Sequence, residues 1–204
     1  MNLSLKKLNH KYISPVIYII CLIPFFVGIF LIFKDNLGPN PIEFIIKETG
    51  SWAIYFICLT LMISPIIKIT NINKIIFFRR IFGLFSFFYA FLHFISFIWF
   101  EHFFDIREIY NDVISRPFIT IGFISFILLI PLALTSNSFM MKSMGKFWKK
   151  LHMLIYLISI LAVFHFWWMR SGKNDFDDPI LLGLIIFSLL LFRIIKKIFF
   201  KIRF

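Results

Sequence analysis

The stretch from Lys146 to Trp168 carries two histidines in an apolar run that opens with three lysines and a tryptophan. His152 lies at the charged end, and His165 follows thirteen residues later. That spacing is about 20 Å along an α-helix, roughly two thirds of the hydrocarbon thickness of a bilayer. An ionisable side chain inside a membrane span is costly and marks a functional site by default, and neutral imidazole is the commonest protein ligand for a metal. We therefore interpret this stretch as a transmembrane helix that carries haem.

A third histidine, His93, lies inside another apolar run, near the middle of a predicted span at about 82–100. A haem iron held by two histidines needs axial nitrogens about 4 Å apart on facing helices. His93 and His165 are the pair best matched in depth, so we expect them to bind one iron. His152, at the inner edge of its span, is a candidate to ligate a second haem, to position a haem propionate, or to face a flavin or a quinone.

The spacing within the 146–168 stretch raises a geometric problem. Thirteen residues at about 100° each leave the side chains of His152 and His165 roughly 140° apart around an ideal helix. The sequence therefore predicts either a bulge or kink between them, or two histidines that serve different faces. His10, in the N-terminal tail, and His102, next to Glu101, are expected to be ordinary surface residues.

Six predicted membrane spans must position these histidines. The chain has 204 residues, of which 60% are hydrophobic, and a soluble domain of this size would lack the polar surface to cover such a core. Apolar runs long enough to cross a bilayer recur along the chain. We expect an all-α six-helix transmembrane bundle, a single domain over residues 1–204, with spans at about 15–33, 51–69, 82–100, 117–135, 151–168 and 180–195.

The distribution of charge predicts the orientation of the bundle. Of the basic residues, sixteen lie in the termini and the 2–3 and 4–5 loops, and six lie in the other loops. The positive-inside rule therefore predicts that both termini are cytoplasmic. Insertion topology and anionic lipid account for the net charge of +12 without nucleic acid. All ten acidic residues fall in the outer loops, where they suit either a solvated surface or a soluble partner with basic patches.

Other sequence features limit the possible functions. The chain contains no G-x-G-x-x-G or G-x-x-x-x-G-K-[ST] motif, no apparent internal repeat, and no room for a soluble nucleotide-binding domain. If the protein moves electrons, their donor must therefore be a separate protein or a membrane quinol. Cys21 and Cys58 lie inside predicted spans without a C-x-x-C motif, and we expect them to be small packing residues.

Several short motifs occur together along nearly the whole chain. They are Leu37–Pro41, Thr49–Gly50, Arg79–Leu84, Leu92–His93, Arg116–Gly122, Leu134–Ser136, and Gly145–Lys146 with Trp148, Leu151–His152, Tyr156 and His165. Singly these motifs are weak, but in this order and spacing they resemble the MsrQ (YedZ) family. That family provides the haem-binding membrane subunit of the periplasmic methionine sulfoxide reductase system, and it belongs to the ferric-reductase-like transmembrane superfamily.

The resemblance implies haem b ligation by His93, His152 and His165. It also implies an electron-transfer subunit in the bacterial inner membrane, rather than a catalytic one, serving a periplasmic molybdopterin enzyme that reduces methionine sulfoxide in oxidised proteins. Family members are associated with FMN and take electrons from quinol or a cytosolic flavin reductase. The superfamily has two histidines on each of two haem helices, whereas span three here has one, so one haem is expected. Arg79 and Arg80 are expected to neutralise haem propionates or lipid phosphates.

Two other functions remain open from the residues alone. One is a stand-alone cytochrome b, similar to a ferric reductase, that acts on ferric iron or quinone. The other is a non-redox transporter or structural membrane protein in which the histidines only form inter-helix hydrogen bonds, each worth about 0.6 kcal/mol.

Overall fold

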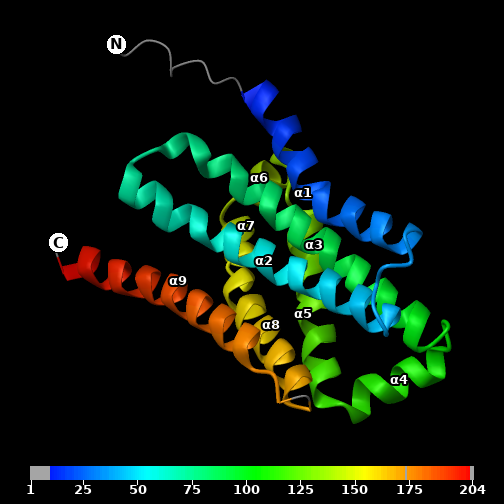
Figure 1. Cartoon of the computed structure of the whole chain (residues 1–204). Coiled ribbons are helices and arrows are strands. Elements are labelled where there is room, and N and C mark those ends of the chain that lie inside the picture. Colours follow the sequence, from blue (N-terminus) through cyan, green and yellow to red (C-terminus); the bar gives the residue numbers. More distant parts are fainter. Residues whose placement is uncertain (1–9, 173, 203–204) are drawn as a thin grey trace. The chain divides into compact units, whose positions relative to one another are not determined.

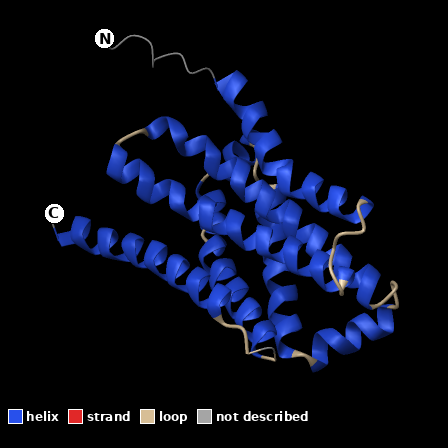
Figure 2. Ribbon diagram, in the orientation of Figure 1, coloured by secondary structure: helices blue, strands red, loops and turns tan. Residues whose placement is uncertain are grey.

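The computed structural model describes residues 10–172 and 174–202, and every regular element in these ranges is a helix (Figures 1 and 2). In chain order these are α1 (His10–Phe33), α2 (Pro41–Thr70), the 3₁₀ helix η2 (Asn73–Phe77), α3 (Phe78–Ser96), the π-helix η3 (Phe97–Glu101), α4 (Ile106–Ser115), α5 (Pro117–Leu134), α6 (Ser138–Met144), α7 (Lys146–His152), α8 (Leu154–Ser171) and α9 (Asp177–Ile202).

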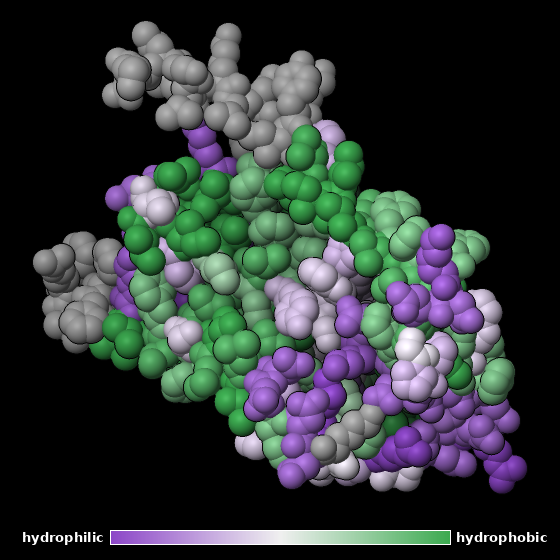
Figure 3. Space-filling view, viewed as in Figure 1, coloured by the Kyte–Doolittle hydropathy of each residue, from purple (hydrophilic) through white to green (hydrophobic). Residues whose placement is uncertain are grey.

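Six helical segments of the described residues are long and apolar enough to cross a membrane, which confirms the predicted all-α fold with six membrane helices. They are Ser14–Phe33, Pro41–Thr70, Asn73–Glu101, Pro117–Leu134, Lys146–Ser171 and Asp177–Lys196. Apolar side chains cover much of the face seen in Figure 3, and hydrophilic ones gather in the lower part of that view, over α4 and the α8–α9 loop. This surface suits a protein whose solvent is lipid along its sides and water at its ends.

The chain divides into two compact units, residues 1–45 and residues 46–204. The first unit holds α1, which contains Pro15 and Pro24, together with the start of α2. The second unit holds the remainder of α2 and every later helix. All the residues of the candidate site described below belong to this second unit.

The second span begins ten residues earlier than the sequence predicts, at Pro41 rather than near residue 51. Asn40 caps it, because its side-chain oxygen accepts a hydrogen bond from the backbone N–H of Glu43 at 3.2 Å. Proline at the first helical position adds to the same signal, since its fixed φ suits the first turn and its missing N–H would have no partner there. The polar residues between Pro41 and Gly50 therefore form a first helical segment instead of a loop.

Two clusters of buried side chains hold the helices of the second unit together. In the first, Ile57 and Leu61 of α2 pack with Leu129, Leu132 and Ile158. The second cluster contains Ile54, Cys58, Phe166, Leu182 and Ile186. Together they join α2, α5, α8 and α9, so α8 is packed on several sides along its length.

The fifth span is interrupted between its two histidines. Helix α7 ends at His152 and α8 begins at Leu154. Around Met153 the backbone bonds run between residues three apart, from the N–H of Met153 to the carbonyl of Lys150 and from the N–H of Tyr156 to the carbonyl of Met153. This tighter turn changes the angular relation of His152 to α8, and it is the irregularity that the sequence analysis gave as one of two alternatives.

Candidate functional site

Two of the three predicted membrane histidines meet in the structure. The rings of His93 on α3 and His165 on α8 have centroids 6.0 Å apart, with an interplanar angle of 75°. Two imidazoles on one iron have nitrogens about 4 Å apart, and about 1 Å more separates each nitrogen from its ring centre, so a centroid distance of about 6 Å is expected. The separation of these two rings therefore matches a shared metal.

In each of these two rings, one nitrogen forms a hydrogen bond with a backbone carbonyl oxygen of a neighbouring helix. The Nδ1 of His93 lies 2.9 Å from the carbonyl oxygen of Ile46 on α2, and the Nδ1 of His165 lies 2.7 Å from that of Phe118 on α5. A carbonyl oxygen can only accept, so both Nδ1 atoms carry the proton in these bonds. In neutral rings this leaves both Nε2 lone pairs free for a metal, the arrangement typical of ligating histidines.

The surroundings of the pair also suit a flat apolar prosthetic group. Both rings are partly buried, and the Phe118 ring lies 6.4 Å from that of His165, centroid to centroid. Nearby, Phe94 of α3 and Phe123 of α5 have centroids 5.9 Å apart. Two neutral imidazoles in an aromatic, membrane-embedded setting are the donor set of a b-type haem. The residues present therefore fit the prosthetic group that the sequence predicts.

His152 lies apart from this pair, in a different environment. Its ring stacks on Trp148, with centroids 3.9 Å apart. Its Nδ1 lies 3.1 Å from the carbonyl oxygen of Trp148, and its Nε2 lies 3.5 Å from the hydroxyl of Ser136. Over the described residues no group of three or more His, Cys, Asp or Glu side chains is placed to hold a metal ion. The three predicted ligands thus divide into a pair and a separate third histidine.

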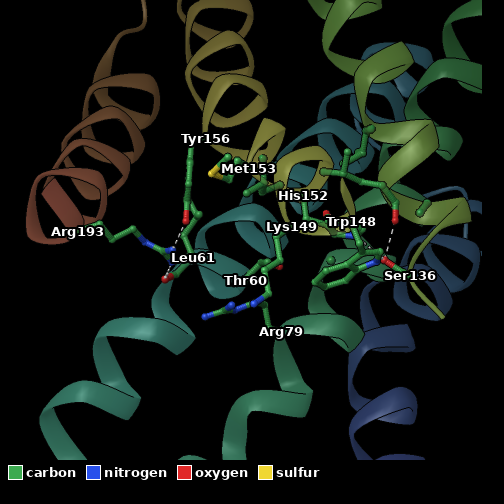
Figure 4. Close-up of a pocket in the computed structure, with 15 residues that line it drawn as sticks. Thr60, Leu61, Arg79, Ser136, Trp148, Lys149, His152, Met153, Tyr156 and Arg193 are labelled. Atoms are coloured by element: carbon green, nitrogen blue, oxygen red, sulfur yellow. Dashed lines mark hydrogen bonds between the residues drawn. The ribbon is translucent and has the colours of Figure 1, made fainter. Parts of the chain in front are cut away.

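A cavity of about 350 Å³ opens beside His152 (Figure 4). Its walls come from six helices and include three basic side chains, Arg79 of α3, Lys149 of α7 and Arg193 of α9. None of the described residues that line it is acidic. Thr60, Ser136, Trp148 and Tyr156 supply further polar groups around it. A cavity with this charge is suited to an anionic or strongly hydrogen-bonding ligand.

Arg193 is the part of this cavity that the sequence analysis did not single out. Its guanidinium donates at 2.8 Å to the hydroxyl of Tyr156 and at 2.6 Å to the carbonyl of Leu61, while its buried Nε has no hydrogen-bond partner. The predicted residue Arg79 donates to the hydroxyl of Ser64. Its neighbour Arg80 is exposed and is not among the residues that line the cavity. A basic residue inside the last apolar run was the available signal for Arg193.

At the α4 end of the bundle, His102 is buried rather than at the surface, so that prediction was wrong. Only 7% of the residue is exposed, and its Nε2 lies 3.3 Å from a carboxylate oxygen of Asp112, which also contacts Arg116 at 3.3 Å. The sequence could not reveal this burial, because it depends on α4 folding back over the end of η3. His10 begins α1, and its side chain lies outside the described part of the structure.

The spanning helices and the facing histidines define the class of the protein. Residues 49–163 match the family model described as ferric reductase like transmembrane component. This match covers His93, His152, Arg79, Arg80 and Phe118. It begins after Ile46 and ends just before His165. The protein is a multi-pass membrane protein of the ferric-reductase-like transmembrane class.

Curated relatives narrow this class further. A protein of Herminiimonas arsenicoxydans is 50% identical over 183 residues, covering 89% of this chain and 84% of the relative. Proteins of Polaromonas naphthalenivorans (42% over 190 residues, 93% and 87%) and Bordetella pertussis (39% over 182 residues, 89% and 88%) are also similar. All three are named protein-methionine-sulfoxide reductase heme-binding subunit MsrQ, and the chain belongs to this MsrQ family. No solved structure matches the chain.

Proposed function

We propose that this protein is the haem b membrane subunit of a methionine sulfoxide reductase system. In this proposal it relays electrons across the bacterial inner membrane to a periplasmic molybdopterin enzyme that repairs oxidised proteins. The observation that carries the proposal is the facing pair His93 and His165, 6.0 Å apart between centroids, each with Nδ1 on a carbonyl. The haem-binding role named for the relatives supports the same conclusion.

In this proposal the two histidines would hold the iron through Nε2, and the haem, when bound, would supply one-electron transfer. The protein's own contribution is to orient the two rings and to exclude water. The bonds to Ile46 and Phe118 hold each imidazole in the tautomer whose Nε2 is free to bind a metal. The packed helices keep the rings in a low-dielectric setting, which favours the less charged form of the site.

The residues around His152 do not fit a second haem held by two histidines. The polar neighbours of this ring are Trp148 and Ser136, and no second histidine lines the cavity. We therefore propose one haem per chain. Arg79, Arg193 and Lys149 instead suit the phosphate of FMN or the carbonyl oxygens of a quinone, so this cavity is the proposed entry for electrons from quinol or from a cytosolic flavin reductase.

The positive-inside rule places this entry on the cytoplasmic side, with both termini. His93 and His165 then lie toward the periplasmic side, because they are close to the ends of the spans at Glu101 and Ser171. Electrons that enter beside His152 would leave near α4 and the α8–α9 loop. The acidic residues of these segments offer a solvated surface against which a periplasmic enzyme can dock.

The proposal is tested on the purified protein with its haem. We expect a reduced-minus-oxidised spectrum of a low-spin b-type haem at one haem per chain. We also expect that the reduced haem is reoxidised by a molybdopterin methionine sulfoxide reductase only when methionine sulfoxide is added. A protein without a Soret shift on dithionite addition would overturn the redox function. Reoxidation by ferric chelates or quinone, but not by the reductase, would instead favour a stand-alone cytochrome b.

A further inference from the structure

The two facing histidines are oriented by equivalent hydrogen bonds from Nδ1 to a backbone carbonyl. His93 lies 47 residues after Ile46, the residue whose carbonyl binds it, and His165 lies 47 residues after Phe118. In each case a glycine follows the carbonyl by four residues, Gly50 in α2 and Gly122 in α5. Carbonyl, glycine and histidine thus recur at the same intervals, the second set 72 residues after the first.

Each glycine provides space for the ring of its histidine. A Cβ added to Gly50 would lie 3.0 Å from Nδ1 and 3.1 Å from Cε1 of His93. A Cβ added to Gly122 would lie 2.7 Å from both Nδ1 and Cε1 of His165. Contacts below 3.0 Å force a neighbouring group to move. The ring of His165 could therefore not keep its present position beside an alanine at Gly122, and the ring of His93 would be tightly packed beside an alanine at Gly50.

The spacing of four residues has a physical reason. In an α-helix each Cβ points toward the N-terminus and covers the turn before it. A side chain at Gly50 or Gly122 would therefore cover the carbonyl of Ile46 or Phe118, which already accepts the helical bond from the residue four positions later. Glycine leaves that carbonyl accessible to a side chain from another helix. The carbonyl of Ile46 accepts in addition from the hydroxyl of Thr49 at 3.1 Å. The glycine thus exposes the acceptor and makes room for the imidazole that uses it.

A further contact follows the same register. The hydroxyl of Ser86 on α3 donates to the carbonyl of Ala53 on α2 at 3.2 Å. At the corresponding positions, 72 residues later, the hydroxyl of Ser125 on α5 donates to the carbonyl of Ile158 on α8 at 3.5 Å, in the reverse direction. The two helix pairs, α2 with α3 and α5 with α8, therefore share these contacts at corresponding positions. The residue types around the contacts differ between the two pairs, and no repeat is apparent in the sequence.

We infer that α2–α3 and α5–α8 are two copies of one helix pair, and that Gly50 and Gly122 are positioning residues that hold the two axial histidines in register. With the same offset of 72 residues, Arg80 in the first helix pair corresponds to His152 in the second. His93 and His165 are thus equivalent positions in the two copies, whereas His152 has no histidine as its counterpart. This inference rests on the proposed haem site, and its test is chosen to fail separately from it.

The test compares Gly50→Ala, Gly122→Ala and Gly83→Ala in the full-length protein purified with haem. Gly83 is the matched control, because it lies in α3 and a Cβ there would meet only Thr60, at 3.9 Å. We expect Gly122→Ala to lower the haem-to-protein ratio about tenfold or more. Gly50→Ala, the milder clash, should retain more haem but shift the g-values of its electron paramagnetic resonance spectrum and its midpoint potential. Gly83→Ala should match the unchanged protein in all of these.

The helix content and the elution volume of each variant show whether it folds. If Gly122→Ala does not fold, Gly50→Ala still tests the inference. Full haem content with unshifted g-values in both Gly50→Ala and Gly122→Ala would overturn the positioning role. That result leaves the haem site itself intact if His93→Ala and His165→Ala still lose haem. Haem retained in the histidine variants would instead refute the site.

Discussion

His93 and His165 face each other at a centroid distance of 6.0 Å, although the Nδ1 atoms of the two rings bind carbonyls on two other helices. Four helices thus define the positions of two side chains. α3 and α8 carry the rings, while α2 and α5 orient them. Such a site is held by the packing of the bundle as a whole, which explains why the pair can be rigid without any direct bond between the rings.

Replacing either histidine of the pair removes one of the two proposed ligands of the iron. We expect His93→Ala and His165→Ala each to lower the haem-to-protein ratio at least tenfold, because each loses one of the two imidazoles that would hold the haem. The ratio is measured by the pyridine haemochrome assay after purification. Phe164→Ala, next to His165 but exposed, and His10→Ala are controls that should keep their haem. A histidine variant that retains a normal low-spin spectrum would contradict the assignment of the ligands.

His152→Ala should separate electron entry from haem binding. The ring contacts Trp148 and Ser136 beside the cavity and does not reach the His93–His165 pair. We expect the variant to keep its haem and its spectrum, while reduction by a quinol or a flavin reductase slows about tenfold or more. Stopped-flow absorbance at the Soret band measures both. Phe147→Ala, an exposed neighbour in α7, is the control. Loss of haem in His152→Ala would show that this histidine is itself a ligand.

Arg193→Gln tests the charge of the cavity. Arg193 donates to Tyr156 and Leu61 and supplies one of three cations near the ligand space. A hydrogen bond to a charged group is worth about 1.5–3 kcal/mol, so KM for reduced FMN should rise about tenfold or more. KM for a neutral quinol should change less. Lys196→Gln, on the same helix but outside the cavity, is the control. Equal increases for both donors would point to a general loss of structure.

Asp175→Asn tests the ion pair at the opposite end of α8. The side chain of Arg170 is 5% exposed, with Nη1 2.6 Å from Asp175 and Nη2 3.7 Å from Asp178. Removal of the nearer carboxylate leaves a buried cation with only the longer contact, and we expect a loss of about 1–3 kcal/mol in stability. This is measured as a lower thermal midpoint in detergent. Asp178→Asn should cost less, and Asp177→Asn should change little. A smaller effect for Asp175→Asn than for Asp178→Asn would contradict the geometry.

The pairing of His93 with His165 could be predicted because membrane depth follows from position within an apolar span. A span has a limited length in lipid, so residues at similar distances from its ends lie at similar heights. The interruption near Met153 was one of the two alternatives that the thirteen-residue spacing left open. The other alternative, two histidines that serve different sites, is also found, because His152 lies against Trp148 and His165 against His93. These features depend on the local geometry of single helices and on the thickness of the bilayer.

Features that depend on contacts between distant segments could not be predicted in this way. His102 looked like a surface residue because nothing near it in the chain indicates that Asp112 of α4 will cover it. Arg193 was counted among the basic residues at the end of the last span, where basic side chains commonly reach toward lipid phosphates. Its bonds to Tyr156 and Leu61 form only once α9 packs beside α8 and α2.

The interruption at Met153 has a mechanical consequence. His152 belongs to α7, a helix of seven residues, whereas His165 belongs to the longer α8. In the proposed function, a rotation of α7 on arrival of a donor would be absorbed at this joint and would not displace the imidazole of His165. The proposed entry for electrons could then adapt its shape to different donors, while the His93–His165 pair kept its geometry.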